Sequence, residues 1–524
     1  MSFKKSCCTP SIKTDMTELL KDIDENMLIS SQKSILEYFK KYKSENYISL
    51  SQKDFDYGTR RITKPGYYIL KEDIVFHPNP DNDFKPTASQ IKSGLYPVPG
   101  PYNLNFFAAL TIETEGVVVD LNGHTIKQSK EHFLMQRFYA NIELASAPFI
   151  GVQGPSPGIS GAHASGKKVA IINGTLGLSS HHGIHGNGSK DILLAGLNIV
   201  DFQVAGISLN GLSNAVFKDI TIKNSSKDVA VLSSYSQAIF ALPFVERLLE
   251  RKPDATIYIQ GREKGVKDIY DELKNSIEKS RRKILKTGRT SDKLFHNEGG
   301  LSDTNIYGLT LNVNGVLIGG FLKERPDKPD IGNDNIYLQG VTIDNICSHS
   351  REIVGLSDST ILGKKVDSYG RGKPAITGPV GGLFNYRAYT GRGGNYISNP
   401  LGNAQALLGL HSSRGTVFFT RPIIDWMNGD INISEVLADR NINEIRGADS
   451  MNHKMKGNIG FFVSGGKNVI CKELSVTNVA NTGRFESGTK RGGLVDGEKA
   501  FTHALVACED ITINGESYTE NTFI

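Results

Sequence analysis

The sequence predicts an all-β solenoid, a right-handed parallel β-helix, and three observations carry that prediction. A unit that begins at Gly183 repeats without a gap 23 residues later at Gly206, and an earlier copy begins at Lys168. Each unit holds short runs in which apolar and polar residues alternate, the pattern of strands with one buried face. Glycine accounts for 55 of 524 residues, against a usual share of ~7%, and many glycines stand between the runs. Units of this size cannot bury their apolar faces alone, so we expect them to stack.

The same frame returns at 335–343 and 468–476, so later units should join the same stack. Strands of stacked units pair with their equivalents about 4.8 Å away. An amide or carboxylate side chain follows the last strand of most units, which predicts either a hydrogen-bonding ladder in the turn or residues that merely tolerate turn geometry. These residues are Gln128, Asp201, Asn224, Asn345 and Asn478. Cys471 and Cys508 fall at one position of the frame, so we expect two stacked, reduced thiols.

Helical patterns lie outside the repeat. Asp15 opens a capping-box pattern that is followed by apolar residues at helical spacing, which predicts one or two helices within 14–43. Similar spacing predicts inserted helices at 236–252 and 268–285. The chain is therefore divided into an N-terminal helical segment at 1–58, a first β-helix part at 59–225, a helical insertion at 226–302, a middle β-helix part at 303–346, an irregular glycine-rich insertion at 347–456 and a C-terminal β-helix part at 457–524.

Composition excludes several classes of protein. Sixty Lys and Arg against 55 Asp and Glu leave a net charge of +5, too small for a protein that coats nucleic acid, and we expect no sequence-specific nucleic-acid partner. No apolar stretch reaches the ~18–20 residues of a membrane span, and the first residues lack the apolar core of a signal peptide, so synthesis in the cytoplasm is expected. Five cysteines do not indicate a disulfide framework. For Cys7 and Cys8, palmitoylation, metal binding and two idle thiols all stay open.

The densest set of titratable side chains in the repeat is a histidine cluster, His181, His182 and His185. Alternation places Ile184 inward, so His185 and Gly183 should face outward, with the other two histidines on a turn. Three interpretations stay open: an ordinary surface or turn role, a glycan or metal contact, and acid–base catalysis near neutral pH. In the catalytic interpretation the carboxylates would come from Asp201 or Asp219 of neighbouring units. We assign no metal site and no cofactor.

Two further segments are candidate interaction surfaces. The segment 384–396 mixes aromatic, arginine and glycine residues, and it is either a glycan or polyanion surface or a loop that packs on the repeat. Its candidate ligand-binding residues are Tyr386, Arg387, Tyr389, Arg392 and Tyr396. The segment 279–289 places six basic residues at the end of a predicted helix. They complement the helix dipole, form a solvated basic face or bind a phosphate- or sulfate-bearing partner.

Short motifs of the first units resemble a known superfamily. PGYYIL at 65–70, DI at 73–74, VVVDLNGHTI at 117–126 and IINGT at 171–175 resemble the opening of right-handed β-helix proteins of the pectin-lyase-like superfamily. The long form with a helical insertion resembles uncharacterised β-helix proteins of giant DNA viruses. The resemblance covers 63–225 and, more loosely, 303–524. It implies a virion protein made in the host cytoplasm, with glycans or other virion proteins as partners.

The resemblance leaves two functions. The leading one is a non-catalytic structural or binding protein, associated with the virion and contacting glycans or capsid components. The alternative is a polysaccharide lyase or glycoside hydrolase, although the Asp-Asp and Arg-Ile-Lys motifs that the superfamily's polygalacturonases use are absent from the sequence. A homo-oligomer is also left open, because many β-helix fibres form trimers.

Overall fold

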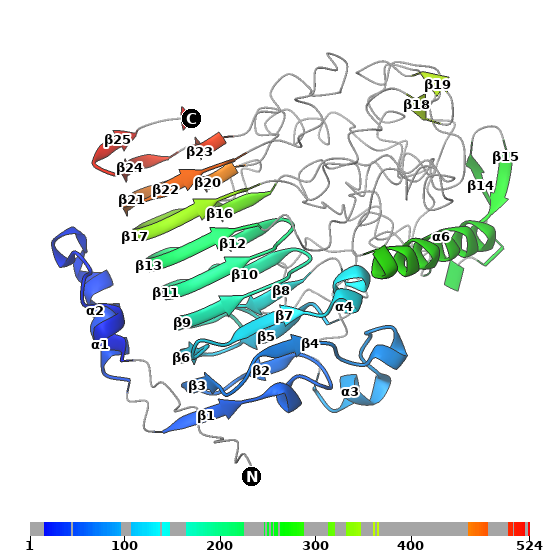
Figure 1. Ribbon diagram of the computed structural model, residues 1–524, viewed down its shortest axis with the longest axis horizontal. Coiled ribbons are helices and arrows are strands. Elements are labelled where there is room, and N and C mark those ends of the chain that lie inside the picture. Colours follow the sequence, from blue (N-terminus) through cyan, green and yellow to red (C-terminus); the bar gives the residue numbers. More distant parts are fainter. Residues whose placement is uncertain are drawn as a thin grey trace, which may run out of the picture.

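The computed structural model describes residues 15–42, 46–95, 106–136, 139–146, 164–224, 246, 249–250, 253–254, 256–259, 262–287, 313–319, 332–346, 360–361, 364–365, 459–479, 501–506, 508–518 and 522–524. These residues form two large, mostly parallel sheets with helices beside them (Figure 1).

The larger sheet, sheet A, has 13 strands. Ten follow one path: β1 (Tyr47–Leu50), β3 (Gly66–Leu70), β6 (Glu115–Asp120), β9 (Lys167–Leu176), β11 (Lys190–Val200), β13 (Ser213–Lys223), β17 (Asn333–Asp344), β21 (Gly466–Lys472), β24 (Glu509–Ile513) and β25 (Glu516–Tyr518). Beside this path lie β4 (Ile74–Phe76), β7 (Thr125–Gln128) and β22 (Ser475–Thr477).

The second sheet, sheet B, has nine strands. In spatial order they are β2 (Arg60–Ile62), β5 (Ala108–Ile112), β8 (Ala140–Glu143), β10 (His182–Asn187), β12 (Ala205–Asn210), β16 (Asn314–Gly319), β20 (Ile459–Ser464), β23 (Phe501–Val506) and β26 (Thr522–Phe523). Two small antiparallel pairs stand apart, β14 (Thr256–Ile259) with β15 (Arg262–Gly265) and β18 (Thr360–Ile361) with β19 (Lys364–Lys365).

The 23-residue interval is the register of the central strands in both sheets. In sheet B, His182 pairs with Ala205, and in sheet A, Lys190 pairs with Ser213, in both cases in parallel. The expected parallel pairing of equivalent strands is confirmed. From β8 to β13 the chain alternates between the two sheets, and the strands lie one above another from the blue end to the red end in Figure 1.

Residues in the left-handed region bend sheet A at regular positions. Asp191 has φ 60° and Gly196 has φ 62° within β11, and the equivalent residues of β13 are Asn214 at 56° and Asp219 at 51°. Glycine, asparagine and aspartate adopt this conformation at the lowest cost, which explains why they recur there. The bends turn each long strand so that apolar residues on both sides of the bend can face one core.

The main core lies between the two sheets and joins residues of both. Ile184 and Ile207 of sheet B and Ile192 and Leu194 of sheet A belong to one fully buried cluster. Aliphatic side chains at equivalent positions of successive strands thus stack into continuous columns. Such burial contributes roughly 25 cal/mol for each Å² of apolar surface removed from water.

Helices cover the outer face of sheet A. α1 (Met16–Leu19) and α2 (Ser30–Lys40) lie beside the stack within the interval where the sequence predicts helices (Figure 1). Asp15 accepts a hydrogen bond from the backbone N–H of Thr17 at 2.8 Å and so caps α1. Phe39 of α2 packs in one apolar cluster with Leu193 and Val216 of the sheet.

The remaining helices lie at the ends of the strands and in the first insertion. They are α3 (Ala88–Lys92), α4 (Lys130–Met135) and α6 (Val266–Thr287), with 3₁₀ turns at Glu25–Met27, Gln52–Asp54 and Pro80–Asn82. The predicted helix at 268–285 is confirmed as α6. The other inserted helix, at 236–252, falls almost wholly outside the described residues.

The predicted fold class, an all-β right-handed parallel β-helix, is wrong. The chain forms two mostly parallel sheets of 13 and nine strands with helices, an α/β-like arrangement and not a β-solenoid. The repeat predicts which strands pair and in what register, because that information is in its period. It does not predict how the strands divide into sheets or that helices cover a sheet face, because those features lie outside the repeating unit.

The cysteine prediction is half right. Cys471 and Cys508 are both buried, and neither forms a disulfide. They are not stacked, because Cys471 pairs in register with Ile513, while the thiol of Cys508 lies 3.4 Å from the carbonyl oxygen of Val463. Burial raises the pKa of Cys471 well above its usual value, which keeps this thiol protonated.

Candidate functional site

A row of polar side chains crosses the outer face of sheet B. On each strand the residue beside a core aliphatic faces the opposite side of the sheet, as Ser208 does between Ile207 and Leu209. The parallel register places these outward residues on neighbouring strands side by side. This outer polar row consists of Arg61, Thr111, Glu143, His185 and Ser208.

A histidine–glutamate pair occupies the middle of the outer polar row. Nδ1 of His185 lies 2.7 Å from Oε2 of Glu143 on the neighbouring strand, and the residues are 6% and 0% exposed. Burial raises the pKa of Glu143, and the nearby imidazole partly opposes that shift. Oε1 of Glu143 has no hydrogen-bond partner among the residues that the structure describes. The bond fixes the orientation of the His185 ring and leaves its Nε2 directed away from the carboxylate.

The other two histidines join this pair. The ring of His182 stacks on that of His185 with centroids 4.8 Å apart and an angle of 7° between the planes. Nδ1 of His181 lies 3.0 Å from Nδ1 of His182, so one ring donates and the other accepts. Burial, followed by the charges of His181 and His185, lowers the pKa of His182 well below its usual value. His182 is therefore neutral at neutral pH.

Gly183 allows both His182 and His185 to face outward. Contrary to the prediction, Gly183 faces the core: a Cβ there would lie 2.6 Å from Cγ2 of Ile199 and 2.5 Å from the carbonyl oxygen of Gly206. Gly183 and Ile184 are thus two successive inward residues between two outward histidines. Any larger side chain at Gly183 would push the strands apart and separate the rings.

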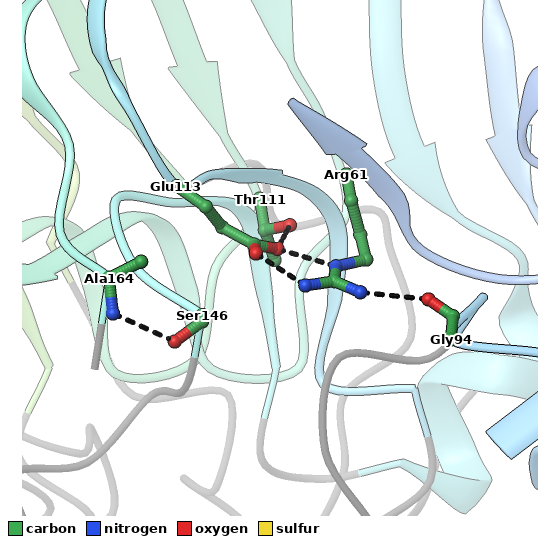
Figure 2. Close-up of polar contacts among 6 residues, drawn as sticks. All are labelled: Arg61, Gly94, Thr111, Glu113, Ser146 and Ala164. Atoms are coloured by element: carbon green, nitrogen blue, oxygen red, sulfur yellow. Dashed lines mark hydrogen bonds and ion pairs between the residues drawn. The ribbon is translucent and has the colours of Figure 1, made fainter. Parts of the chain in front are cut away.

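An arginine–glutamate ion pair lies at the Arg61 end of the outer polar row (Figure 2). The guanidinium of Arg61 bonds both carboxylate oxygens of Glu113, at 2.9 and 2.7 Å, and donates to the carbonyl oxygen of Gly94 at 2.8 Å. The hydroxyl of Thr111 donates to the same carboxylate at 2.7 Å. The hydrogen bond with Glu113 is the main cause of the raised pKa of Arg61. This two-point bond ties β2 to the end of β5.

The structure brings together only part of the predicted site. His181, His182 and His185 form one cluster, as described above. Asp201 lies at the bend after β11, where its carbonyl oxygen accepts a hydrogen bond from the backbone N–H of Ser179 at 2.9 Å. Asp219 lies on β13 of sheet A and forms an ion pair with Lys218, so it belongs to the other sheet. The carboxylate that contacts the cluster is Glu143.

Sequence reasoning missed Glu143 because its strand falls outside the 23-residue frame. β8 pairs with β10 through Ile142 and Ile184, which are 42 residues apart. The available signal was a carboxylate between two apolar residues, Ile142 and Leu144, where alternation requires an outward side chain. That signal identifies the face of the sheet but not the partner on it.

The candidate ligand-binding residues of the second insertion, Tyr386, Arg387, Tyr389, Arg392 and Tyr396, lie outside the described residues. The basic segment is described up to 287, at the end of α6, where a guanidinium nitrogen of Arg281 lies 2.8 Å from the sulfur of Met135. No group of three or more His, Cys, Asp or Glu side chains in the described part of the chain is arranged to hold a metal ion.

A groove of about 470 Å³ separates α2 from the bend of sheet A. Its lining includes Tyr38 of α2 and, from the strands, Lys168, Lys190, Asp191 and Asp334. The ammonium of Lys168 lies 5.9 Å from the centre of the Tyr38 ring. An exposed aromatic ring beside groups of both charges suits a polar ligand, and the volume is within the range of small-molecule sites.

Comparisons with known protein families, with characterised proteins and with solved structures found no match. The resemblance to β-helix proteins of giant DNA viruses, and the virion localisation that it implies, therefore stay predictions, and the corrected fold class removes the architecture on which they depended. Among the helices that the structure describes, none is long and apolar enough to cross a membrane.

Proposed function

We propose that the protein has a structural or ligand-binding function and does not cleave polysaccharides. The observation that supports this best is the pairing of the buried carboxylates on the outer face of sheet B. Glu113 is bonded by Arg61 and Glu143 by His185, each through a base on a neighbouring strand. Because each of these carboxylates is bonded to a base on a neighbouring strand, they do not form the two opposed carboxyl groups that glycoside hydrolysis requires.

The alternative, a glycoside hydrolase or polysaccharide lyase, requires a different arrangement. A hydrolase places two carboxyl groups across the scissile bond, one as acid and one as base or nucleophile. Of the carboxylates predicted to help the histidines, Asp219 is on the other sheet. The one observation in favour of this alternative is the His185–Glu143 hydrogen bond, which leaves an imidazole nitrogen for proton transfer.

The groove beside α2 is the surface that suits a ligand. It combines an exposed tyrosine ring with two lysines, and Lys168 and Lys190 have no carboxylate within ion-pair distance among the described residues. An extended polar ligand, such as a glycan, would contact several strands at once here.

A polysaccharide panel tests the proposal. Full-length protein is incubated with neutral and acidic polysaccharides, new reducing ends and unsaturated uronates are assayed, and binding is measured on the same panel. We expect binding without turnover, and we expect Lys190→Ala to weaken binding while Lys33→Ala, an exposed lysine of α2 outside the groove, does not. Turnover that disappears in His185→Ala but persists in Asp219→Asn would replace the proposal with the enzymatic alternative.

A further inference from the structure

We infer that Ser208, His185 and Glu143 form a nucleophilic relay that reacts with carboxylic esters. Ser208 would be the nucleophile, His185 the general base and Glu143 the positioning residue. This inference goes beyond the proposed function and does not depend on it, because ester cleavage and ligand binding in the α2 groove involve different faces of the molecule.

The three residues occupy one line across three neighbouring strands. Glu143 of β8 pairs in register with His185 of β10, which pairs in register with Ser208 of β12. Parallel strands lie about 4.8 Å apart, and residues in register project from the same face. His185 therefore lies on the strand between those of a carboxylate and a hydroxyl residue, which is the order that nucleophilic catalysis by serine requires.

The His185 ring is held in the orientation that such a base needs. Its Nδ1 is bonded to Glu143 at 2.7 Å, and the two nitrogens of an imidazole diverge, so Nε2 is directed away from β8. The stacked ring of His182 contacts the face of the His185 ring and not the edge that carries Nε2. A carboxylate on Nδ1 sets the tautomer and stabilises the imidazolium that forms when Nε2 takes a proton.

The burial of Glu143 is a second, independent observation. Its carboxylate is 0% exposed, and Oε1 has no partner in the described structure. An unsatisfied buried carboxylate oxygen costs stability, and such groups concentrate at functional sites. A carboxylate kept only to join two strands would be expected to use both oxygens, as Glu113 does with Arg61.

The reaction balances without any further reactant except water. Oγ of Ser208 attacks the ester carbonyl carbon while Nε2 of His185 takes the hydroxyl proton, and the imidazolium then protonates the leaving alcohol as the ester C–O bond breaks. Water attacks the acylated serine in the same way, with His185 again taking and returning the proton. One ester and one water yield one acid and one alcohol, and the enzyme is regenerated.

Covalent labelling tests the relay directly. Full-length protein is treated with an alkyl fluorophosphonate, in which the serine oxygen displaces fluoride, and the modified residue is identified by peptide mass spectrometry. We expect modification at Ser208 and none in Ser208→Ala, with full modification retained in Ser189→Ala, a buried serine on the adjoining turn. Absence of modification at Ser208 in the folded protein would overturn the inference, whatever the polysaccharide panel shows.

Glu143→Gln separates a positioning role from a structural one. It keeps the size of the side chain but no longer stabilises the imidazolium, so the labelling rate at Ser208 should fall by ~10²-fold or more. The pH dependence of labelling should also change, which loss of packing alone would not cause. An unchanged rate and pH profile in a folded Glu143→Gln variant would show that His185 does not act as the base.

Discussion

Both sheets pair their central strands in parallel, but their outer faces have opposite chemistry. Outside sheet A, apolar residues such as Val118, Leu193 and Val216 form a continuous stripe that the N-terminal helices cover. Outside sheet B, the equivalent line is the outer polar row, in which Glu143 and His185 are buried and bonded to each other.

The difference shows that strand pairing and outer-face chemistry are specified separately. Inward aliphatic residues set the register in both sheets, whereas the bends at left-handed residues lie within the strands of sheet A. The outward residues differ between the two sheets, so the outer face of sheet A is a docking surface for helices and that of sheet B carries the outer polar row. The first is stabilised by apolar burial, which is insensitive to pH, whereas the second contains buried ionisable groups whose contribution to stability depends on pH.

The largest expected effect is on the covered face of sheet A. Phe39 of α2 is 0% exposed in the cluster between helix and sheet. Phe39→Ala should lower the free energy of unfolding by about 3–5 kcal/mol, or release the N-terminal helices, because it leaves a large cavity. Urea denaturation and limited proteolysis of the first 45 residues measure both outcomes. Tyr38→Ala, on the same helix but 37% exposed, is the control and should have a much smaller effect on stability.

The next effect concerns the histidine–glutamate pair on sheet B. His185→Ala leaves the carboxylate of Glu143 buried without its base, which should cost about 3 kcal/mol at pH 7. Adding Glu143→Leu should recover much of that loss, since the stranded charge is then removed. A double variant that is no more stable than His185→Ala in urea denaturation would show that the pair is not coupled.

The third prediction uses the pH sensitivity that distinguishes the two faces. His182 has a pKa far below the 6.5 of an unfolded histidine, and burial in the core also lowers the pKa of His132 to about 3. The unfolded chain therefore binds more protons below pH 6.5, and the folded state loses stability as pH falls, down to about pH 3 for His132. From pH 6.5 to 5 each histidine should cost about 2 kcal/mol. The raised pKa of Glu143 acts with the opposite sign and offsets part of this loss.

Urea denaturation at pH 7.5 and pH 5 measures this slope. His182→Gln should remove about 2 kcal/mol of the difference between the two pH values. An equal slope in the wild type and His182→Gln would mean that His182 has an ordinary pKa in the folded protein.

The sequence predicted the strand pairing and register of the units that follow the 23-residue repeat. The offset from Gly183 to Gly206 gave the correct register, because a fixed interval and a fixed pattern of inward residues leave one way to pair the strands. For the polar residues that follow the last strand of each unit, the sequence left open a hydrogen-bonding ladder and simple tolerance of turn geometry. Asn224 accepts from the backbone N–H of Phe202, Gln128 accepts from that of Ser180, and the amide of Asn345 donates to the backbone carbonyl of Asn224, so these amides satisfy backbone groups of neighbouring turns.

The candidate site could be predicted only in part, because its partners come from strands at irregular intervals. The three histidines are close in sequence and were found together. Glu143 is 42 residues away on a strand that the period does not reach, and Arg61 belongs to a still earlier strand. Contacts across a sheet depend on which strands are neighbours, and the sequence indicates this only where the repeat is regular. The division into two sheets with helices had no signal in the repeat at all.

The smallest expected effect is at the exposed end of the outer polar row. The side chain of Arg61 is 28% exposed and that of Glu113 is 4% exposed, and two of the guanidinium N–H groups bond the carboxylate. Arg61→Lys keeps the charge but cannot make both bonds, so it should cost about 1 kcal/mol. Thr111→Val removes the third donor to the same carboxylate and should cost about as much.

Because both changes act on one carboxylate, the double variant should lose more stability in urea denaturation than the sum of the single variants. Strict additivity would indicate that solvent replaces the missing donors at Glu113, and that this end of the row, unlike the Glu143–His185 pair, is open to water.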